Sequence, residues 1–474
     1  MCGIFGTVNL LADPESVRQI AHRGPDANGS IDLFIGSHSV HLAHTRLAIV
    51  DLSEAGAQPM AFDSAGAYLV FNGEIYNHLA LRSGLQFKDF KGHSDTESLL
   101  HHLIENGPHA STELNGIFSF AYVDQRHKKL FLVRDPYGVK PLYYAEKNNG
   151  LAFCSEISPL IDLFKPSISP LNLSELLRLR YLPAPNTLFE GIHKLKPGHI
   201  LEIDLSVETI SVRSSSYIQP NRGFIQSNFK EAVAEYGQMF EAAVKRQLMS
   251  DVDVGVFLSG GVDSALVAKY ASENADYKMK AFTVGFEDYS NRDELSLASS
   301  TADLLGMDHV KVMMSEEGFF NSIESLCAIV EEPLATTSII PFHFLCQGAA
   351  ESLKVVLTGQ GADEPLGGYG RYQGALLFDY IPAWIANLLP INAFESLAGH
   401  SLARGIHALR AKGTIERLVS AYEVFSSDEI FRLTGIADHQ SQADIQYFYN
   451  LLECNNRNST AQVMMDLDSR LNLS

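Results

Sequence analysis

The sequence predicts a two-part α/β protein, with a β-rich first part and a doubly wound parallel sheet in the second. Up to about residue 165, short apolar β segments alternate with turn signals. Beyond residue 228, buried strand patterns alternate with helical patterns, which is typical of a parallel sheet covered by helices. With 474 residues, 46% of them hydrophobic, the chain is long enough to bury more than one core.

Apolar runs and helical periodicity place the elements of the first part. Strands are predicted at Ile4–Val8, Leu47–Val50, Tyr68–Phe71, Gly116–Val123, Leu130–Val133 and Leu142–Ala145. Helices are predicted at Ile75–Arg82 and Thr96–Glu105. Residues 166–228 are richer in Ser, Pro and Asn, and predict a connector with a helix at 174–180 and a hairpin through Pro197-Gly198.

The second part opens with an amphipathic helix at 229–249, after Ser227-Asn228. The buried strands that follow are expected at Val254–Leu258, Ala281–Val284, Val310–Met313 and Val355–Thr358. Past about residue 370 the pattern is helical, with polar loops. We therefore expect three regions, at residues 1–165, 166–228 and 229–474.

Composition excludes several classes of function. The formal net charge of −20 argues against binding nucleic acid or an anionic membrane through a basic face. Any phosphate must then be held locally, by backbone N–H groups and metal. The five cysteines form no C-x-x-C pair, so we expect a reducing, cytoplasmic location without a zinc site or disulfides. No secretory signal is present, and Pro382 and Pro390 break the apolar stretch Ile381–Phe394, which is too short to span a membrane.

The N-terminal sequence Met1-Cys2-Gly3 predicts a catalytic cysteine. Removing the initiator methionine would leave Cys2 with a thiol and a free α-amino group on one residue. An amine that titrates near about 8 can take the proton of a thiol that titrates near about 8.5, so nucleophile and base would lie together. The alternative is an ordinary N-terminal strand that begins with a buried cysteine.

Polar groups at predicted strand ends in the first part suit an amide substrate with an α-amino acid head. Such a ligand needs a guanidinium for its carboxylate, carboxylates for its ammonium and donors for a developing oxyanion. Arg46, the triplet Asn72-Gly73-Glu74 and Asp95 supply these groups. Each has a structural alternative, because Asn-Gly is a common turn pair and Arg46 could pair with Asp51.

Two glycine-rich segments in the second part follow predicted parallel strands. Ser259-Gly260-Gly261-Val262-Asp263-Ser264 opens a helix near Ser264, where free backbone N–H groups can cradle a pyrophosphate. It lacks the lysine of a P-loop, so it does not suggest γ-phosphate transfer. The second segment runs from Thr358 to Glu364. Both loops fit one nucleotide site, although the first alone could be a plain strand-to-helix turn.

The motifs MCGIFG, HRGPD (22–26), HTRLAIVD (44–51), FNGEIYNH (71–78) and SDTE (94–97) resemble the glutamine amidotransferase domain of the asparagine synthetase family. The resemblance implies an αββα N-terminal-nucleophile fold joined to a doubly wound ATP-pyrophosphatase domain. It implies that Cys2 attacks glutamine, that Asn72 and Gly73 form the oxyanion hole, and that Arg46 binds the carboxylate. Substrate contacts are also implied for Ile49, Val50, Glu74 and Asp95. HRGPD and the stretch Arg134–Tyr143 also match, and we interpret both as mainly structural turns.

The same resemblance implies an ATP and Mg²⁺ site in the second part. Asp263 and Asp363 would hold Mg²⁺ on the phosphates, and Ser259, Gly261 and Ser264 would cradle them. The remaining implied nucleotide contacts are Leu258, Val284, Thr358, Gly359 and Gln360. A weaker match, Glu332-Pro333 with Thr336-Thr337, resembles the segment near the acceptor carboxylate.

The implied activity is ligation: ammonia from glutamine attacks an acyl-adenylate, apparently β-aspartyl-AMP, made from ATP. Alternatives are another carboxylate acceptor, or a truncated glutaminase module. Gln360 replaces an acid usual in the family, and a lysine of the family falls beyond Ser474. We therefore expect the 474-residue form to hydrolyse glutamine and to synthesise amide poorly. Expected partners are glutamine, ATP and a carboxylate such as aspartate; a homodimer is left open by the sequence.

Overall fold

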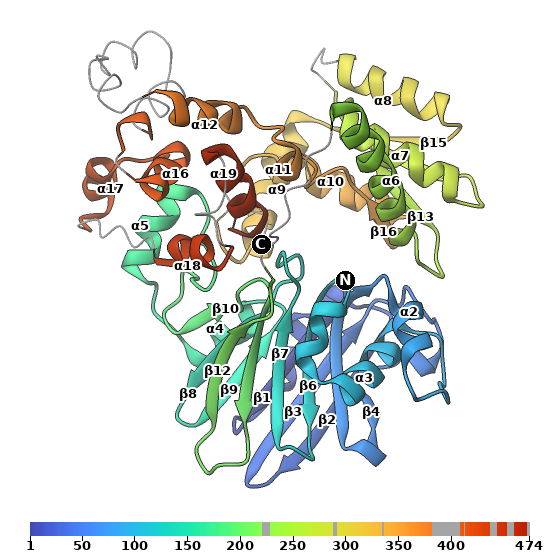
Figure 1. Cartoon of the computed structure of the whole chain (residues 1–474), viewed down its shortest axis with the longest axis vertical. Coiled ribbons are helices and arrows are strands. Elements are labelled where there is room, and N and C mark those ends of the chain that lie inside the picture. The colour runs from blue at the N-terminus through green and yellow to red at the C-terminus, as the bar shows by residue number, and fades with distance from the viewer. Residues whose placement is uncertain are drawn as a thin grey trace.

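The computed structural model describes residues 1–219, 228–287, 292–333, 336–381, 408–411, 413–436, 443–452 and 459–471. Two antiparallel sheets form one half of the molecule, and a parallel sheet with many helices forms the other (Figure 1). Among the described helices, none combines the length and apolar composition that crossing a bilayer requires. The apolar stretch Ile381–Phe394 lies outside the described residues beyond Ile381.

Each sheet of the first half has six strands in the described residues. The order in the first sheet is β10 (Ile192–Lys194), β8 (Tyr143–Lys147), β9 (Gly150–Cys154), β1 (Gly3–Val8), β3 (His38–Arg46) and β2 (Ala27–Ile35). The order in the second sheet is β12 (Ser211–Ser216), β11 (His199–Asp204), β7 (Lys129–Arg134), β6 (Gly116–Asp124), β5 (Ala67–Ile75) and β4 (Met60–Phe62). Strands β1 and β5 each have a hydrogen-bonded neighbour on both sides, so the backbone that carries their residues is held in place.

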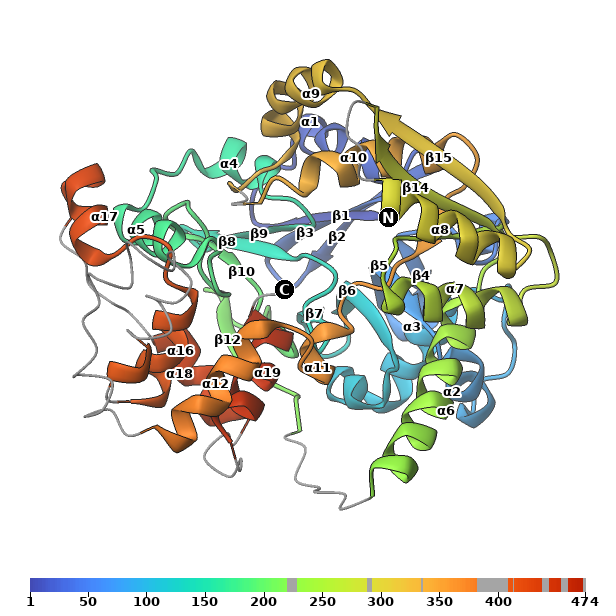
Figure 2. The ribbon, with the colours of Figure 1, turned by 90° about the horizontal axis from the view of Figure 1, so that it is seen from above.

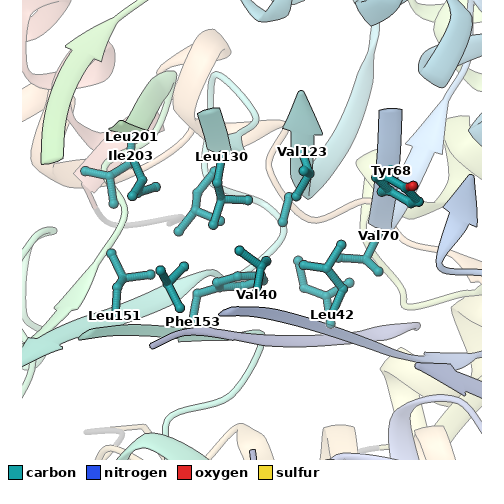
Figure 3. Packing of buried hydrophobic residues seen from close by; sticks show 14 of the residues in the cluster. Val40, Leu42, Tyr68, Val70, Val123, Leu130, Leu151, Phe153, Leu201 and Ile203 are labelled. Atoms are coloured by element: carbon teal, nitrogen blue, oxygen red, sulfur yellow. The ribbon is translucent and has the colours of Figure 1, made fainter. Parts of the chain in front are cut away.

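The core of the first half lies between its two sheets (Figure 3). Successive side chains alternate in direction along a strand, so Ile4 and Val8 of β1 enter this core while Phe5 packs on the outer face. The outer face of the first sheet is covered by α1 (Pro14–Gln19) and α4 (Ser158–Phe164), and that of the second by α2 (His78–Gly84) and α3 (Asp95–Asn106). This arrangement confirms the predicted αββα sandwich.

Several predicted elements of the first half were wrong in detail. No strand forms at Leu47–Val50; the strand there, β3, ends at Arg46. Strand β5 runs to Ile75, so the triplet that starts at Asn72 lies inside a strand instead of after one, and α2 begins only at His78. The turn at Pro197-Gly198 is not a hairpin either, because β10 and β11 lie in different sheets; the hairpin is formed by β11 and β12.

The second half contains a parallel sheet in the order β15 (Asp308–Met314), β14 (Lys280–Phe286), β13 (Val254–Phe257) and β16 (Val355–Leu357). One face packs on α6 (Phe229–Gln247), α7 (Val262–Asn274) and α8 (Arg292–Leu304). The other packs on α9 (Glu316–Ile329) and α10 (Ile339–Ala350). Helices on both faces confirm the predicted doubly wound fold. The order reverses between β13 and β16, which is where such folds bind ligands.

Helices make up most of the described chain after residue 362. These are α11 (Asp363–Leu366), α12 (Gly370–Tyr380), α16 (Thr414–Tyr422), α17 (Ser427–Thr434), α18 (Ala443–Leu451) and α19 (Thr460–Leu471). The core shared by α12, α16, α18 and α19 includes Leu179, the last residue of α5 (Pro170–Leu179). The helical cluster therefore packs against a segment that precedes the parallel sheet in the sequence, as the view from above also shows (Figure 2).

Candidate active site

Cys2 lies at the entrance to β1, on the side of the first half that faces the second (Figure 1). β1 pairs with β3 and β9, and Arg23 donates from Nε to the carbonyl of Cys2 at 3.0 Å, so the backbone there is held firmly. Leu47 donates its N–H to Sγ at 3.4 Å, and Sγ lies 3.7 Å from the carbonyl oxygen of Leu47. Burial raises the pKa of the Cys2 thiol.

The N-terminal amine lies in the same pocket. Burial, with Lys140 and Arg23 nearby, lowers the pKa of the Met1 amino group to about 6. Removal of Met1 would free an amine on Cys2, one residue along the chain. A lowered amine pKa keeps the base unprotonated at neutral pH, as proton transfer from the thiol requires.

Asn72 and Gly73 face this pocket from inside β5. The side chain of Asn72 is 1% exposed, and neither its Nδ2 nor its Oδ1 has a hydrogen-bond partner among the described residues. Buried amides are normally paired, so an unpaired one in a cavity points to a ligand. A Cβ on Gly73 would lie 2.1 Å from the carbonyl oxygen of Ile117, so only glycine lets β5 approach β6 here.

Arg46 ends β3 with its guanidinium held by the following loop. It donates to the carbonyl of Ser53 at 2.9 Å and to that of Asp51. The alternative pairing with the Asp51 carboxylate is wrong, since that carboxylate accepts from Ser53 and from the backbone N–H of His93. Ile49, in the same loop, lines the cavity together with Val50.

Two carboxylates line the same cavity as the arginine. Asp95, the first residue of α3, accepts from the N–H of Ile75 at 2.9 Å, and Oε2 of Glu74 has no partner among the described residues. Burial raises the pKa of Asp95 to about 6, and burial with repulsion from Asp95 raises the pKa of Glu74 well above its usual range. Such a pair is poised to accept a cation.

Lys140 is a residue of the pocket that sequence analysis did not single out. It belongs to the stretch Arg134–Tyr143, whose turn is held by Asp135: its carboxylate accepts from the N–H groups of Tyr137, Val139 and Lys140. The turn is structural as expected, but it also aims the Lys140 side chain into the cavity beside Met1. Burial lowers the pKa of Lys140.

One cavity of about 450 Å³ joins the pocket to the second half. From the first half it is lined by Cys2, Arg46, Asn72, Glu74 and Asp95, among others. From the second half it is lined by α10, through Phe342 and Cys346, and by the whole of β16 as far as Thr358. The pocket around Cys2 and the carboxyl end of β16 therefore open into the same space.

The first glycine-rich loop leaves the N-terminus of α7 open. Gly261 precedes the helix and supplies no side-chain cap, so its first N–H groups are free to bind an anion. The Ser259 and Ser264 hydroxyls lie 2.8 Å apart, and Asp263 lies in the first turn of the helix. Leu258 is buried, and its N–H is bonded to the carbonyl of Phe282.

The second loop touches the first. A Cβ on Gly359 would lie 2.7 Å from the backbone nitrogen of Ser264, so the loops meet at the switch point of the sheet. Thr358, Gly359 and Gln360 also line a cavity of about 260 Å³ against α6. Asp363 starts α11. Val284 lies on β14 and packs into the core below.

The segment after α9 is positioned by ion pairing. The Glu332 carboxylate binds Lys194 at 2.8 Å and accepts from the N–H of Leu188, both in the first part of the chain. These contacts join the two halves of the molecule, and within the described residues no hydrogen bond or ion pair joins Glu332 to the glycine loops. Thr336 hydrogen-bonds with Ser338.

No cluster of three or more His, Cys, Asp or Glu side chains suited to a metal occurs within the described ranges. A divalent cation here would need phosphate oxygens and water to complete its ligand shell. An open helix N-terminus with Asp263 in its first turn fits a metal-bound pyrophosphate of this kind.

A partly buried thiol at the start of an αββα sandwich, joined to a doubly wound sheet with two glycine loops, is the arrangement that the sequence predicts for a glutamine amidotransferase domain followed by an ATP-binding domain. Family models agree: residues 1–217 match the glutamine amidotransferase domain, and residues 235–469 match asparagine synthase. The chain belongs to the family of glutamine-hydrolysing asparagine synthetases.

Relatives cover most of the chain. It is 32% identical over 409 residues to asparagine synthetase 1 of Bacillus subtilis, covering 82% of this chain and 62% of that protein. It is 31% identical over 407 residues to a Methanocaldococcus jannaschii protein provisionally named asparagine synthetase 2, covering 80% and 78%. The B. subtilis glutamine phosphoribosylpyrophosphate amidotransferase structure aligns with a TM-score of 0.34 at 16% identity, over 71% and 72% of the two chains.

Proposed function

We propose that the protein is a glutamine-dependent amidotransferase of the asparagine synthetase type. Cys2 would hydrolyse the side-chain amide of glutamine, and the ammonia would attack an acyl-adenylate made from ATP and a carboxylate, apparently aspartate. The observation that carries the proposal is one cavity that contains the thiol, a guanidinium, two carboxylates and an unpaired amide, and that extends to Thr358, the first residue of the second glycine loop.

The roles follow from charge and geometry. Arg46 would bind the glutamine carboxylate. Its bonds to two loop carbonyls hold the guanidinium in place, and the N–H groups not used in those bonds remain for the ligand. Glu74 and Asp95 would bind the α-ammonium, whose charge relieves their mutual repulsion. The side-chain amide of Asn72 and the N–H of Gly73 would stabilise the oxyanion, with Ile49 and Val50 as walls. Removal of Met1 would supply the amine that takes the proton from Sγ.

The ATP site would use both glycine loops. Ser259, Gly261 and Ser264 would bind the pyrophosphate at the start of α7, and Asp263 with Asp363 would hold Mg²⁺. When bound, the metal would neutralise phosphate charge that this acidic chain cannot. Leu258, Val284, Thr358, Gly359 and Gln360 would surround the rest of the nucleotide. We propose residues 1–165 as the glutaminase unit, 166–228 as a connector whose strands complete its sheets, and 229–474 as the ATP-binding part.

Glutamate release by matched cysteine variants tests the proposal. We expect Cys2→Ala to abolish release of glutamate from glutamine, because it removes the nucleophile. Cys346→Ala is the control: it removes another thiol lining the same cavity and should leave release unchanged. Glutamate release by Cys2→Ala at the parent rate would contradict the proposal. Pyrophosphate release with aspartate, compared with other carboxylates, then identifies the acceptor.

A further inference from the structure

Loop 47–53, between β3 and β4, contacts two residues of the glutaminase pocket. Its first residue, Leu47, contacts Sγ of Cys2 through its N–H. Further along, the carbonyls of Asp51 and Ser53 hold the Arg46 guanidinium. The loop forms no helix or strand, so its own backbone pairing does not fix its position. Its partners outside the loop must therefore do so.

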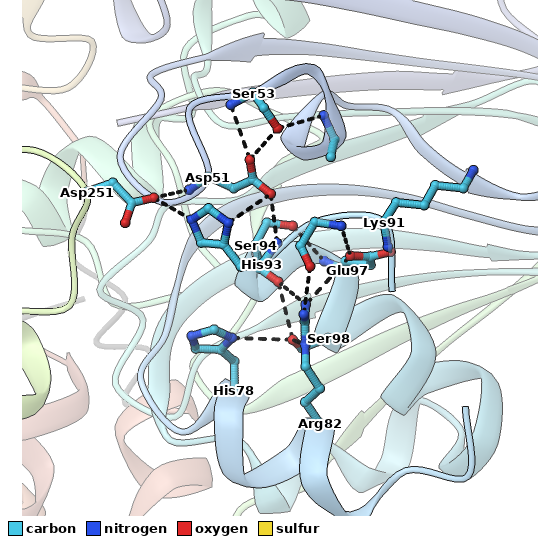
Figure 4. A network of polar contacts seen from close by, with 12 residues as sticks. Asp51, Ser53, His78, Arg82, Lys91, His93, Ser94, Glu97, Ser98 and Asp251 are labelled. Carbon is cyan, nitrogen blue, oxygen red and sulfur yellow. Dashed lines mark hydrogen bonds and ion pairs between the residues drawn. The ribbon is translucent and has the colours of Figure 1, made fainter. Parts of the chain in front are cut away.

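Asp251 of the second half binds this loop at two backbone positions. Its N–H donates to the carbonyl of Ile49 at 2.9 Å, and its Oδ2 accepts from the N–H of Asp51 at 2.7 Å. The same oxygen lies 2.7 Å from Nε2 of His93, which joins the loop to the segment before α3 (Figure 4). The two backbone hydrogen bonds therefore hold the loop at Ile49 and at Asp51. Asp51 is also one of the two residues whose carbonyls bind the Arg46 guanidinium.

Lys354 holds the other side of the loop. Its ammonium lies 2.7 Å from Oδ2 of Asp26 and 3.5 Å from the carbonyl of Ala48. The same Asp26 oxygen accepts from the N–H of Ala48 at 2.7 Å. This pair is partly exposed, with 38% of the lysine side chain and 30% of the aspartate accessible. The Asp251 side chain is equally exposed, with 38% accessible, so water screens both sets of contacts.

Both residues stand at the amino ends of neighbouring strands. Lys354 immediately precedes β16, and Asp251 lies just before β13. These strands pair in parallel, and their carboxyl ends lead into the two glycine loops. Two adjacent strands of the second half therefore contact loop 47–53 at one end and present the proposed ATP site at the other.

We propose that Asp251 and Lys354 are positioning residues that hold loop 47–53 in the conformation that binds glutamine. The inference rests on the proposed function, since it requires hydrolysis of glutamine at Cys2. The second half thus completes the glutamine site by holding this loop in place.

Steady-state glutamate release by variants of these two residues tests the inference. We expect Asp251→Ala to raise the KM for glutamine on the order of tenfold, with a smaller change in kcat, because two hydrogen bonds to a charged acceptor are lost. Asp251→Asn keeps an oxygen acceptor and should recover most of the affinity. Lys354→Met should raise KM by about two- to fivefold.

Asp308→Ala is the matched control. It removes a comparable aspartate of the second half, paired with Lys278 on the surface, and should leave KM unchanged. An unchanged KM in both Asp251→Ala and Lys354→Met would overturn the inference. If Asp251→Ala does not fold, Lys354→Met decides, since loss of a partly exposed pair leaves the fold intact. Activity in Cys2→Ala would instead overturn the proposed function.

Discussion

Replacing Asn72 by alanine should separate catalysis from stability. Asn72 is buried with both polar side-chain atoms unpaired. Asn77, five residues later, is its structural counterpart: Nδ2 donates to the carbonyl of Glu113 at 2.9 Å, and Oδ1 accepts from the N–H of Asn115 at 2.9 Å. One asparagine thus has its hydrogen bonds within the fold, and the other leaves them for a ligand.

The two substitutions should have opposite consequences. Loss of one oxyanion donor costs about 10²–10³ in kcat, so Asn72→Ala should lose that much glutaminase activity. An unpaired buried polar group costs about 1–3 kcal/mol, so the same change should leave the free energy of unfolding unchanged or raised. Asn77→Ala breaks two hydrogen bonds worth about 0.5–1.5 kcal/mol each, and should lower that free energy while sparing kcat.

Glutamate release and urea denaturation of the parent, Asn72→Ala and Asn77→Ala proteins measure both quantities. The reasoning is refuted if Asn72→Ala keeps the parent kcat. It is equally refuted if Asn72→Ala is destabilised as much as Asn77→Ala, because the Asn72 amide would then have a structural partner.

Three further outcomes are expected. Asp263→Asn and Asp363→Asn should each weaken ATP binding in calorimetry while sparing glutamate release, and EDTA should weaken binding in the parent; binding indifferent to EDTA would count against the metal site. The KM for glutamine should rise as pH falls through about 6, because the raised pKa of Asp95 and that of Glu74 let protons displace the ammonium; a flat profile from pH 8 to pH 5 would exclude this role. Gln360→Glu should increase ammonium-dependent pyrophosphate release with aspartate, since a carboxylate can act as acid or base; no increase would show that the position needs only a hydrogen bond.

The sequence predicted the parallel sheet well because each strand contains an apolar run, and the central strands β13 and β14 are mostly buried. The sequence analysis did not predict β2 or β3. β3 (His38–Arg46) carries three histidines, and β2 starts in the turn-like residues Ala27-Asn28-Gly29. Pairing with β1 makes a strand of this polar segment. The neighbouring apolar run Leu47–Val50 instead bonds to groups distant in sequence, which no local pattern encodes.

The candidate site was predicted from the N-terminal position of Cys2, from polar groups such as Arg46 at predicted strand ends, and from the motif resemblance. Sequence reasoning missed Lys140 because its local signal, a turn capped by Asp135, is structural. It missed Asp251 and Lys354 for a different reason: each acts across the boundary between the two halves, on residues about 200 and 330 positions away. A lysine within the matched stretch Arg134–Tyr143 was visible in the sequence, but its burial is apparent only in the structure.

Covalent labelling of Cys2 tests the central claim most directly. The parent protein is incubated with a diazoketone analogue of glutamine and analysed by peptide mass spectrometry, with and without excess glutamine. A nucleophilic thiol beside an amino-acid pocket predicts one adduct, on Cys2, that glutamine prevents. No adduct on Cys2, or an adduct only on the exposed Cys327 that glutamine does not prevent, would contradict the assignment of Cys2 as the nucleophile.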